Sequence, residues 1–131
     1  MKKSIVYLGL ALIVFTTVSF ASNSSNYLKS IITTVEGVSP LNIAISKGDI
    51  ESVKRFIEYG VDVNEESNGM TPLMIAARYN KVEIIKILIS NGAHVNAKDD
   101  KGFTALKYAK LSNANEALEL LKLSQTDNVY Q

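Results

Sequence analysis

The sequence of 131 residues predicts an all-α fold, a short solenoid of about three helix-turn-helix repeats with an N-terminal cap. Segments of the chain recur at a spacing of 32 or 33 residues. Each of them holds two apolar stretches of helical periodicity, separated by a turn signal. A unit of this kind cannot bury both of its flanks alone, so recurrence predicts that the units stack.

Residues 1–21 have the pattern of a secretory signal peptide. Lys2 and Lys3 precede the apolar run Ile5–Phe20, and Ser19 and Ala21 are small residues at the two positions that a signal peptidase reads. We therefore expect cleavage after Ala21. The run is short for a membrane span, which needs about 20 apolar residues, and an uncleaved anchor is the alternative.

Residues 22–35 form a polar linker and a short N-terminal cap in this prediction. Apolar residues recur at helical spacing from Tyr27 to Val35, over a stretch too short for a repeat. We expect a capping helix that covers the flank of the first repeat. Thr33 and Thr34 are β-branched and favour a strand at its end instead.

The first repeat spans about residues 36–66. Its Gly37–Ala44 matches Gly69–Ala76 at a spacing of 32. Helices are expected over 40–46 and 50–59, with Gly48 in the turn between them.

The second repeat, about residues 67–99, carries the clearest helix signals. The Thr71 hydroxyl can cap a helix that begins at Pro72, where the missing amide costs nothing. A second helix begins near Val82 and is apolar almost all round, which is typical of a helix pressed between neighbours. Gly92 ends it in the left-handed conformation.

The third repeat, about residues 100–124, predicts the end of the array. Gly102–Leu106 matches Gly69–Leu73 at a spacing of 33. Lys110 and Lys122 stand where the second repeat has Ala77 and Ile89, so this flank should face water, as a terminal repeat must. Residues 125–131 are expected to form a flexible tail.

Several positions recur together, namely Gly69, Thr71-Pro72-Leu73, Ala76-Ala77, Gly92-Ala93 and Val95-Asn96. On these residues the chain resembles the ankyrin-repeat family, whose unit of about 33 residues carries the signature Thr-Pro-Leu-His-x-Ala. The resemblance covers residues 36 to about 124. The signature His helps to tie neighbouring repeats in the family. Here Asn42, Met74 and Lys107 replace it, which bears on hydrogen bonding between repeats and leaves the expected fold unchanged.

Composition narrows the classes of partner. Without the signal peptide, the 110 remaining residues hold 12 Lys and Arg against 13 acidic residues. Nucleic acids and anionic lipids demand a basic surface, so neither is expected as a partner. The chain has no Cys, which suits export to an oxidising compartment. The Lys-Lys start is typical of bacteria, and we expect a protein of the periplasm or the medium, without membrane contact once the signal is removed.

No constellation of residues in the sequence predicts catalysis. Phosphate loops, nucleophile elbows and metal-ligand spacings are all missing from the chain. His94 is the single His, and Glu65-Glu66 and Asp99-Asp100 fall in connecting turns rather than across a cleft. We expect no enzymatic activity, no cofactor and no metal.

The resemblance implies a binding surface, because ankyrin-like stacks usually meet partners with their turn tips and the ends of their first helices, which line a concave groove. The residues expected to bind a protein are Lys47, Asn68, Met70, Arg78, Tyr79, Lys101, Phe103 and Leu111. Arg, Tyr, Met and Phe are enriched at interface centres. The alternative is that Met70 and Phe103 merely pack against adjacent turns and that Arg78 and Tyr79 are a solvated helix end.

Two functions follow from this sequence. The first is a monomeric, exported adaptor or inhibitor that binds another protein. The second is an accessory factor for a periplasmic enzyme, because small exported ankyrin-type proteins of bacteria are in some cases linked to oxidative-stress enzymes such as catalase.

Overall fold

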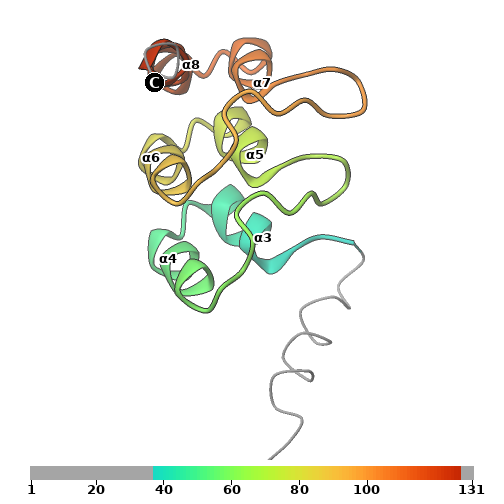
Figure 1. Ribbon diagram of the computed structural model, residues 1–131, viewed down its shortest axis with the longest axis vertical. Coiled ribbons are helices and arrows are strands. Elements are labelled where there is room, and N and C mark those ends of the chain that lie inside the picture. Colours follow the sequence, from blue (N-terminus) through green and yellow to red (C-terminus); the bar gives the residue numbers. More distant parts are fainter. Residues whose placement is uncertain (1–36, 128–131) are drawn as a thin grey trace, which may run out of the picture. The chain divides into compact units, whose positions relative to one another are not determined.

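The computed structural model describes residues 37–127, which fold into three successive pairs of helices (Figure 1). The pairs are α3 (Pro40–Lys47) with α4 (Ile50–Glu58), α5 (Pro72–Arg78) with α6 (Val82–Ser90), and α7 (Ala105–Leu111) with α8 (Asn115–Asp127). This range contains no β-strand, and the predicted all-α repeat solenoid is confirmed. The expected signal peptide, linker and N-terminal cap lie outside the described residues.

The helices form two layers. We call α3, α5 and α7 the first helices and α4, α6 and α8 the second helices. Figure 1 shows each layer as a row, with α5 between α3 and α7, and α6 between α4 and α8. The connections from one repeat to the next extend beyond the first helices, on the side away from the second helices. The first helices and these loop tips therefore share one side of the stack.

The core lies between the layers and between successive repeats. Its fully buried side chains are mainly aliphatic, with small residues where helices approach closely: Leu41, Ile45, Val53, Leu73, Met74, Ala76, Ala77, Ile84, Ile85, Leu88, Ala109, Ala117 and Leu121. Helix α6 was expected to be buried almost all round. Only its inner side is buried, since Val82, Ile87 and Ile89 are half-buried.

The first helices begin where the sequence predicted. Thr71 accepts a hydrogen bond from the backbone N–H of Met74 (3.3 Å), and Pro72 is the first residue of α5. The Met74 sulfur in turn lies 3.4 Å from the backbone N–H of Thr71, so a thioether completes the capping box of this helix. Thr104 caps α7 in the same way through the backbone N–H of Lys107.

Two side chains in the loop between α4 and α5 tie neighbouring repeats together. The Ser67 hydroxyl donates to the carbonyl of Gly37 (2.7 Å) and accepts from the backbone N–H of Ser39 (3.0 Å). Asn64 donates to the carbonyl of Gly92 and accepts from the backbone N–H of His94. Hydrogen bonds between repeats thus exist without the signature His, and they come from residues outside the signature.

Asn80 makes a further tie, from the second repeat to the third. Its backbone is left-handed (φ 53°), the conformation that Gly48 adopts at the same place in the first repeat. The side-chain oxygen of Asn80 accepts a hydrogen bond from the backbone N–H of Ala117 (3.0 Å), in the first turn of α8. A residue of one repeat therefore caps a helix of the next.

The described C-terminal flank exposes two lysines, and the last helix extends further than expected. Lys110 and Lys122 are both exposed, as predicted. Helix α8 continues to Asp127, so Gln125, Thr126 and Asp127 are helical rather than part of a flexible tail. The Gln125 amide donates to the side chain of Asn96 (2.9 Å), which holds this last turn against the loop that follows α6 in the second repeat.

Candidate protein-binding face

The eight residues expected to contact a partner fall into two rows on the side of the first helices. The tip row contains Asn68, Met70, Lys101 and Phe103, in the loops that precede α5 and α7. The helix-end row contains Lys47, Arg78, Tyr79 and Leu111, at the C-terminal ends of α3, α5 and α7. We call the two rows, with the first helices between them, the first-helix face.

The helix-end row is the more exposed of the two. Tyr79 is 50% exposed and Leu111 is 58% exposed, and Lys47 and Arg78 are also exposed. The Arg78 guanidinium lies 5.9 Å from the centroid of the Tyr79 ring, within range of a cation–π contact. An aromatic ring, a cation and an aliphatic side chain are thus available to a partner at neighbouring helix ends.

Two of the four side chains in the tip row are less exposed, because they pack against neighbouring residues of the repeats. Successive tips are adjacent, because a Cβ on Gly37 would lie 3.3 Å from Asn68 and one on Gly69 would lie 3.9 Å from Asp100. Met70 is half-buried and packs against the core. Asn68 and Lys101 are exposed.

Phe103 is also half-buried, and its contacts lie within its own repeat. Its ring meets Tyr108 edge to face, with centroids 5.9 Å apart and an interplanar angle of 71°. The ammonium group of Lys107 lies 5.8 Å from the centroid of the same ring. Phe103 and Met70 thus have a packing role, and the helix-end row carries the free apolar surface.

Asp99 fixes the conformation of the loop that precedes α7 through its hydrogen bonds. Its carboxylate accepts hydrogen bonds from the Tyr108 hydroxyl (2.5 Å) and from the backbone amides of Lys101 and Phe103. The bond from Tyr108, more than any other, lowers the pKa of Asp99, and the two amides act in the same direction. The same bond raises the pKa of Tyr108, and burial of the ring adds to the rise.

Three residues that the sequence reasoning missed lie midway along the first helices. Ile43, Ile75 and Tyr108 occupy equivalent positions, and each is half-buried. Ile75 precedes Arg78 by three residues and Tyr79 by four, so it lies on the same side of α5 as both. Counting back three or four residues from each helix end would have found all three.

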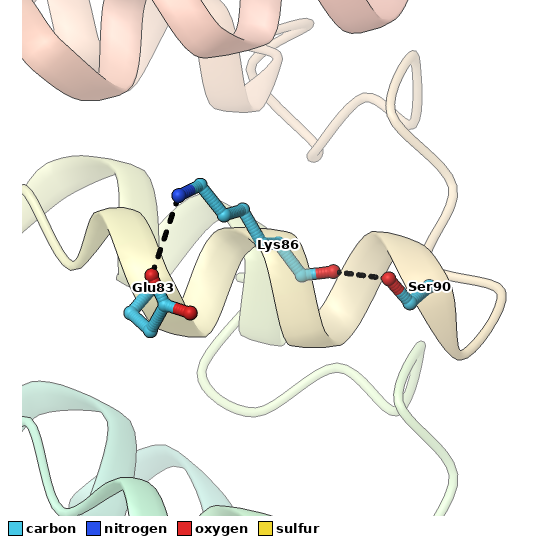
Figure 2. A network of polar contacts seen from close by, with 3 residues as sticks. All are labelled: Glu83, Lys86 and Ser90. Atoms are coloured by element: carbon cyan, nitrogen blue, oxygen red, sulfur yellow. Dashed lines mark hydrogen bonds and ion pairs between the residues drawn. The ribbon is translucent and has the colours of Figure 1, made fainter.

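Charge is divided unevenly between the two layers. The first helices carry four basic residues, Lys47, Arg78, Lys107 and Lys110, and no acidic residue. The second helices carry both signs. Figure 2 shows one pairing on α6, where Lys86 lies 3.3 Å from Glu83 and Ser90 donates to the carbonyl of Lys86. Within residues 37–127, the ion pairs are Lys86 with Glu83 and Lys122 with Glu119, both on second helices.

The described residues contain neither a metal-ligand cluster nor a membrane-spanning helix. Among them, no group of three or more His, Asp or Glu side chains could hold a metal ion. His94 is exposed, and its backbone is bound by Asn64. No helix within residues 37–127 is long and apolar enough to span a bilayer.

Comparison with known proteins agrees with this architecture. The family described as Ankyrin repeats (3 copies) matches the chain over residues 17–99 and again over residues 41–130. A search of curated proteins found no match to the chain. The two family matches together cover most of the sequence and include all six described helices. The chain therefore belongs to the ankyrin-repeat family.

Proposed function

We propose that this protein is an exported, monomeric adaptor or inhibitor that binds another protein through its first-helix face. Ankyrin repeats are characteristic of protein-protein interaction modules, and their surface decides what they bind. The observation that carries the proposal is the exposed set of Arg78, Tyr79 and Leu111 on neighbouring helix ends. Aromatic and Arg side chains of this kind supply most of the binding energy in many interfaces.

The face suits a partner of modest contact area. Three repeats offer about 800 Å² per partner, which corresponds to a standard-size interface. Within it, the half-buried Ile43 and Ile75 extend the apolar surface from the helix ends toward the tips. A partner that covers this strip would exclude water around Tyr79 and Leu111, the condition under which such residues contribute most.

The test uses the full chain in its own host, with a C-terminal tag and chemical crosslinking of intact cells. Tyr79→Ala combined with Leu111→Ala should abolish a specific crosslinked complex. The matched control is Tyr59→Ala, because Tyr59 is 83% exposed and lies at the end of a second helix. A complex that persists in the double variant, or that is lost equally in the control, would contradict the assignment of this face.

The same sample tests export and distinguishes the roles. Intact mass of the recovered protein should correspond to a chain that begins at Ser22, and a mass that includes residues 1–21 would contradict signal cleavage. An inhibitor should abolish the activity of its partner in a purified mixture. An accessory factor for a periplasmic enzyme should instead co-purify with an active, cofactor-bearing enzyme.

A further inference from the structure

We infer that the partner presents an acidic, extended segment, which crosses the ends of the first helices and places its carboxylates on Lys47, Lys81 and Arg78. This inference rests on the proposed function, since it names the chemistry of the partner at the same face. It comes from the placement of charge on the helix-end row.

Basic side chains from successive repeats gather at the helix-end row and beside it, where Lys81 and Lys110 join Lys47 and Arg78. Lys47 ends α3 and Arg78 ends α5. Lys81 lies between them, because its ammonium nitrogen is 3.2 Å from the place that a Cβ on Gly48 would occupy, directly after Lys47. Lys110, in the last turn of α7, continues the positive charge to the third repeat.

The cations of this row are not held in ion pairs within the described part of the chain. None of the four forms an ion pair with a carboxylate of residues 37–127, where both ion pairs lie on second helices. Asp49 follows Lys47 by two residues and interacts with it electrostatically, while both of its oxygens accept hydrogen bonds from Ser52 at the start of α4. Glu83 follows Lys81 by two residues and pairs with Lys86. The four basic side chains are therefore available to the carboxylates of a partner.

The structure also sets the spacing of the segment. Neighbouring packed helices lie about 8–10 Å apart, and an extended chain advances about 3.3 Å per residue. One step from α3 to α5 thus corresponds to about three residues of the partner. Acidic residues three apart would reach successive cations, and an apolar residue between them would meet Tyr79, which is half exposed.

A polypeptide fits this row better than a nucleic acid does. Two of the four cations are directly followed by an exposed residue with apolar surface, since Tyr79 follows Arg78 and Leu111 follows Lys110. Leu111 and the half-buried Ile75 need an apolar partner group, which a phosphate backbone does not provide. Neutralised phosphates supply most of the affinity of proteins for nucleic acid, and four cations can neutralise only a few of them.

Cations at helix C-termini have a simpler explanation, which the test must address. A Lys or Arg in the last turn is stabilised by the helix dipole without any partner. That effect should act equally on second helices, of which α4 has Arg55 in its last turn, whereas α6 and α8 have no basic residue there. A basic last turn thus occurs in all three first helices and in one of the three second helices.

The experiment places a photocrosslinker at the centre of the row. The full chain carrying Tyr79→p-benzoylphenylalanine is irradiated in its host, and the attached partner peptide is sequenced by mass spectrometry. The expected peptide has an excess of at least two acidic residues over basic ones within ten residues of the crosslink. A synthetic, fluorescein-labelled copy of that peptide is then titrated with the purified chain.

Charge variants complete the test. Lys47→Gln combined with Arg78→Gln should weaken binding of the labelled peptide at least about tenfold and flatten its dependence on salt. Lys54→Gln combined with Arg55→Gln removes the same charge from the second helix α4 and should change the affinity less than twofold. Circular dichroism checks that all variants remain folded.

The outcomes separate the two proposals. A crosslinked peptide that is neutral or basic, or an affinity that falls equally in both pairs of variants, overturns the acidic segment and leaves a protein-binding face. A crosslink that is removed by nuclease overturns the assignment to a protein partner. If no crosslink forms at position 79, the proposed face and this inference both fail.

Discussion

Asn42 is a buried polar residue at the position where the family has its signature His. It is 2% exposed, and neither its side-chain nitrogen nor its oxygen has a hydrogen-bond partner among residues 37–127. The equivalent Met74 is equally buried and completes its helix cap with sulfur. An unsatisfied buried amide costs stability, whereas an apolar side chain of similar size does not.

We predict that Asn42→Met raises the free energy of unfolding by about 1–2 kcal/mol. Urea denaturation followed by circular dichroism measures the change. The reverse substitution, Met74→Asn, introduces an amide into the same environment one repeat along and should lower stability. A loss of stability in Asn42→Met would mean that the amide has a function in the folded chain.

The Asp99 and Tyr108 pair should make the free energy of unfolding depend on pH in both the acidic and the basic range. Because the folded pKa of Asp99 is lowered, the contribution of this carboxylate to stability is complete above its unfolded pKa of about 3.9. That contribution is lost as the pH falls through the folded pKa. Because the folded pKa of Tyr108 is raised, its contribution is complete below about 10 and is lost as pH rises through the folded value.

Asp99→Asn should therefore be less stable than the parent at pH 7, and the gap should close as the pH falls below about 4. Thermal unfolding of both proteins from pH 2.5 to 8 measures this gap. Asp100→Asn is the control, since Asp100 is an exposed neighbour that receives none of these hydrogen bonds. A gap that stays constant with pH would contradict the role of the Asp99 charge.

At the scale of elements, α8 depends on a residue of the preceding repeat for its cap. Asn80→Gly keeps the left-handed backbone accessible and removes only the bond to Ala117, so we expect a loss of about 0.5–2 kcal/mol. Asn80→Ala should lose about 1 kcal/mol more, because alanine is strained in that conformation. Chemical denaturation measures both losses.

Asn113 provides the matched control for this cap. Its backbone is also left-handed (φ 55°), but no helix follows the third repeat within the described residues. Asn113→Gly should change stability by less than about 0.5 kcal/mol, as is usual for a surface position. Equal losses in Asn80→Gly and Asn113→Gly would show that backbone conformation, and not the trans cap, sets the effect.

Elements with local signals could be predicted from the sequence, and those fixed by distant contacts could not. Thr71 with Pro72 located the start of α5, and the boundaries expected for α3 and α4 differ from the observed ones by one residue at a single end each. The end of α8 was missed because Gln125 is held by Asn96, twenty-nine residues earlier. The bridging role of Ser67 was missed because a turn serine gives no sign of which neighbour it will meet.

The candidate face, too, could be predicted from the sequence only in part. The exposed helix ends at Arg78, Tyr79 and Leu111 could be located from repeat register alone. The extent to which Met70 and Phe103 are half-buried could not, because it depends on packing against the core and on the ring of Tyr108. Whether these residues bind a protein stays a prediction.

At the scale of the molecule, each repeat packs mainly against its neighbours. The number of helices destabilised by a cavity-forming substitution should therefore depend on which repeat carries it. Ile85 and Leu121 are both fully buried, in the second and the third repeat. Replacing either residue with Ala should cost about 2–5 kcal/mol locally. In Leu121→Ala, amides of α7 and α8 should lose protection while α3 to α5 keep theirs, whereas Ile85→Ala should expose all six helices.

Hydrogen exchange with mass spectrometry measures this difference. The parent protein supplies the reference pattern for each helix. Uniform loss of protection in both variants would indicate that the three repeats unfold as one unit, without a separable third repeat.

The bond between Gln125 and Asn96 bears on whether the array can be lengthened by design. The side chain of Asn64 binds the loop after the second helix of the following repeat, at Gly92 and His94. Asn96 is the equivalent residue one repeat along, and its side-chain oxygen already accepts a hydrogen bond from Gln125 of the same chain. Lys110 and Lys122 are also exposed, so the described C-terminal flank carries charge where the second repeat has Ala77 and Ile89. A grafted fourth repeat would therefore need Gln125 removed and both lysines replaced by small or aliphatic residues before it could dock.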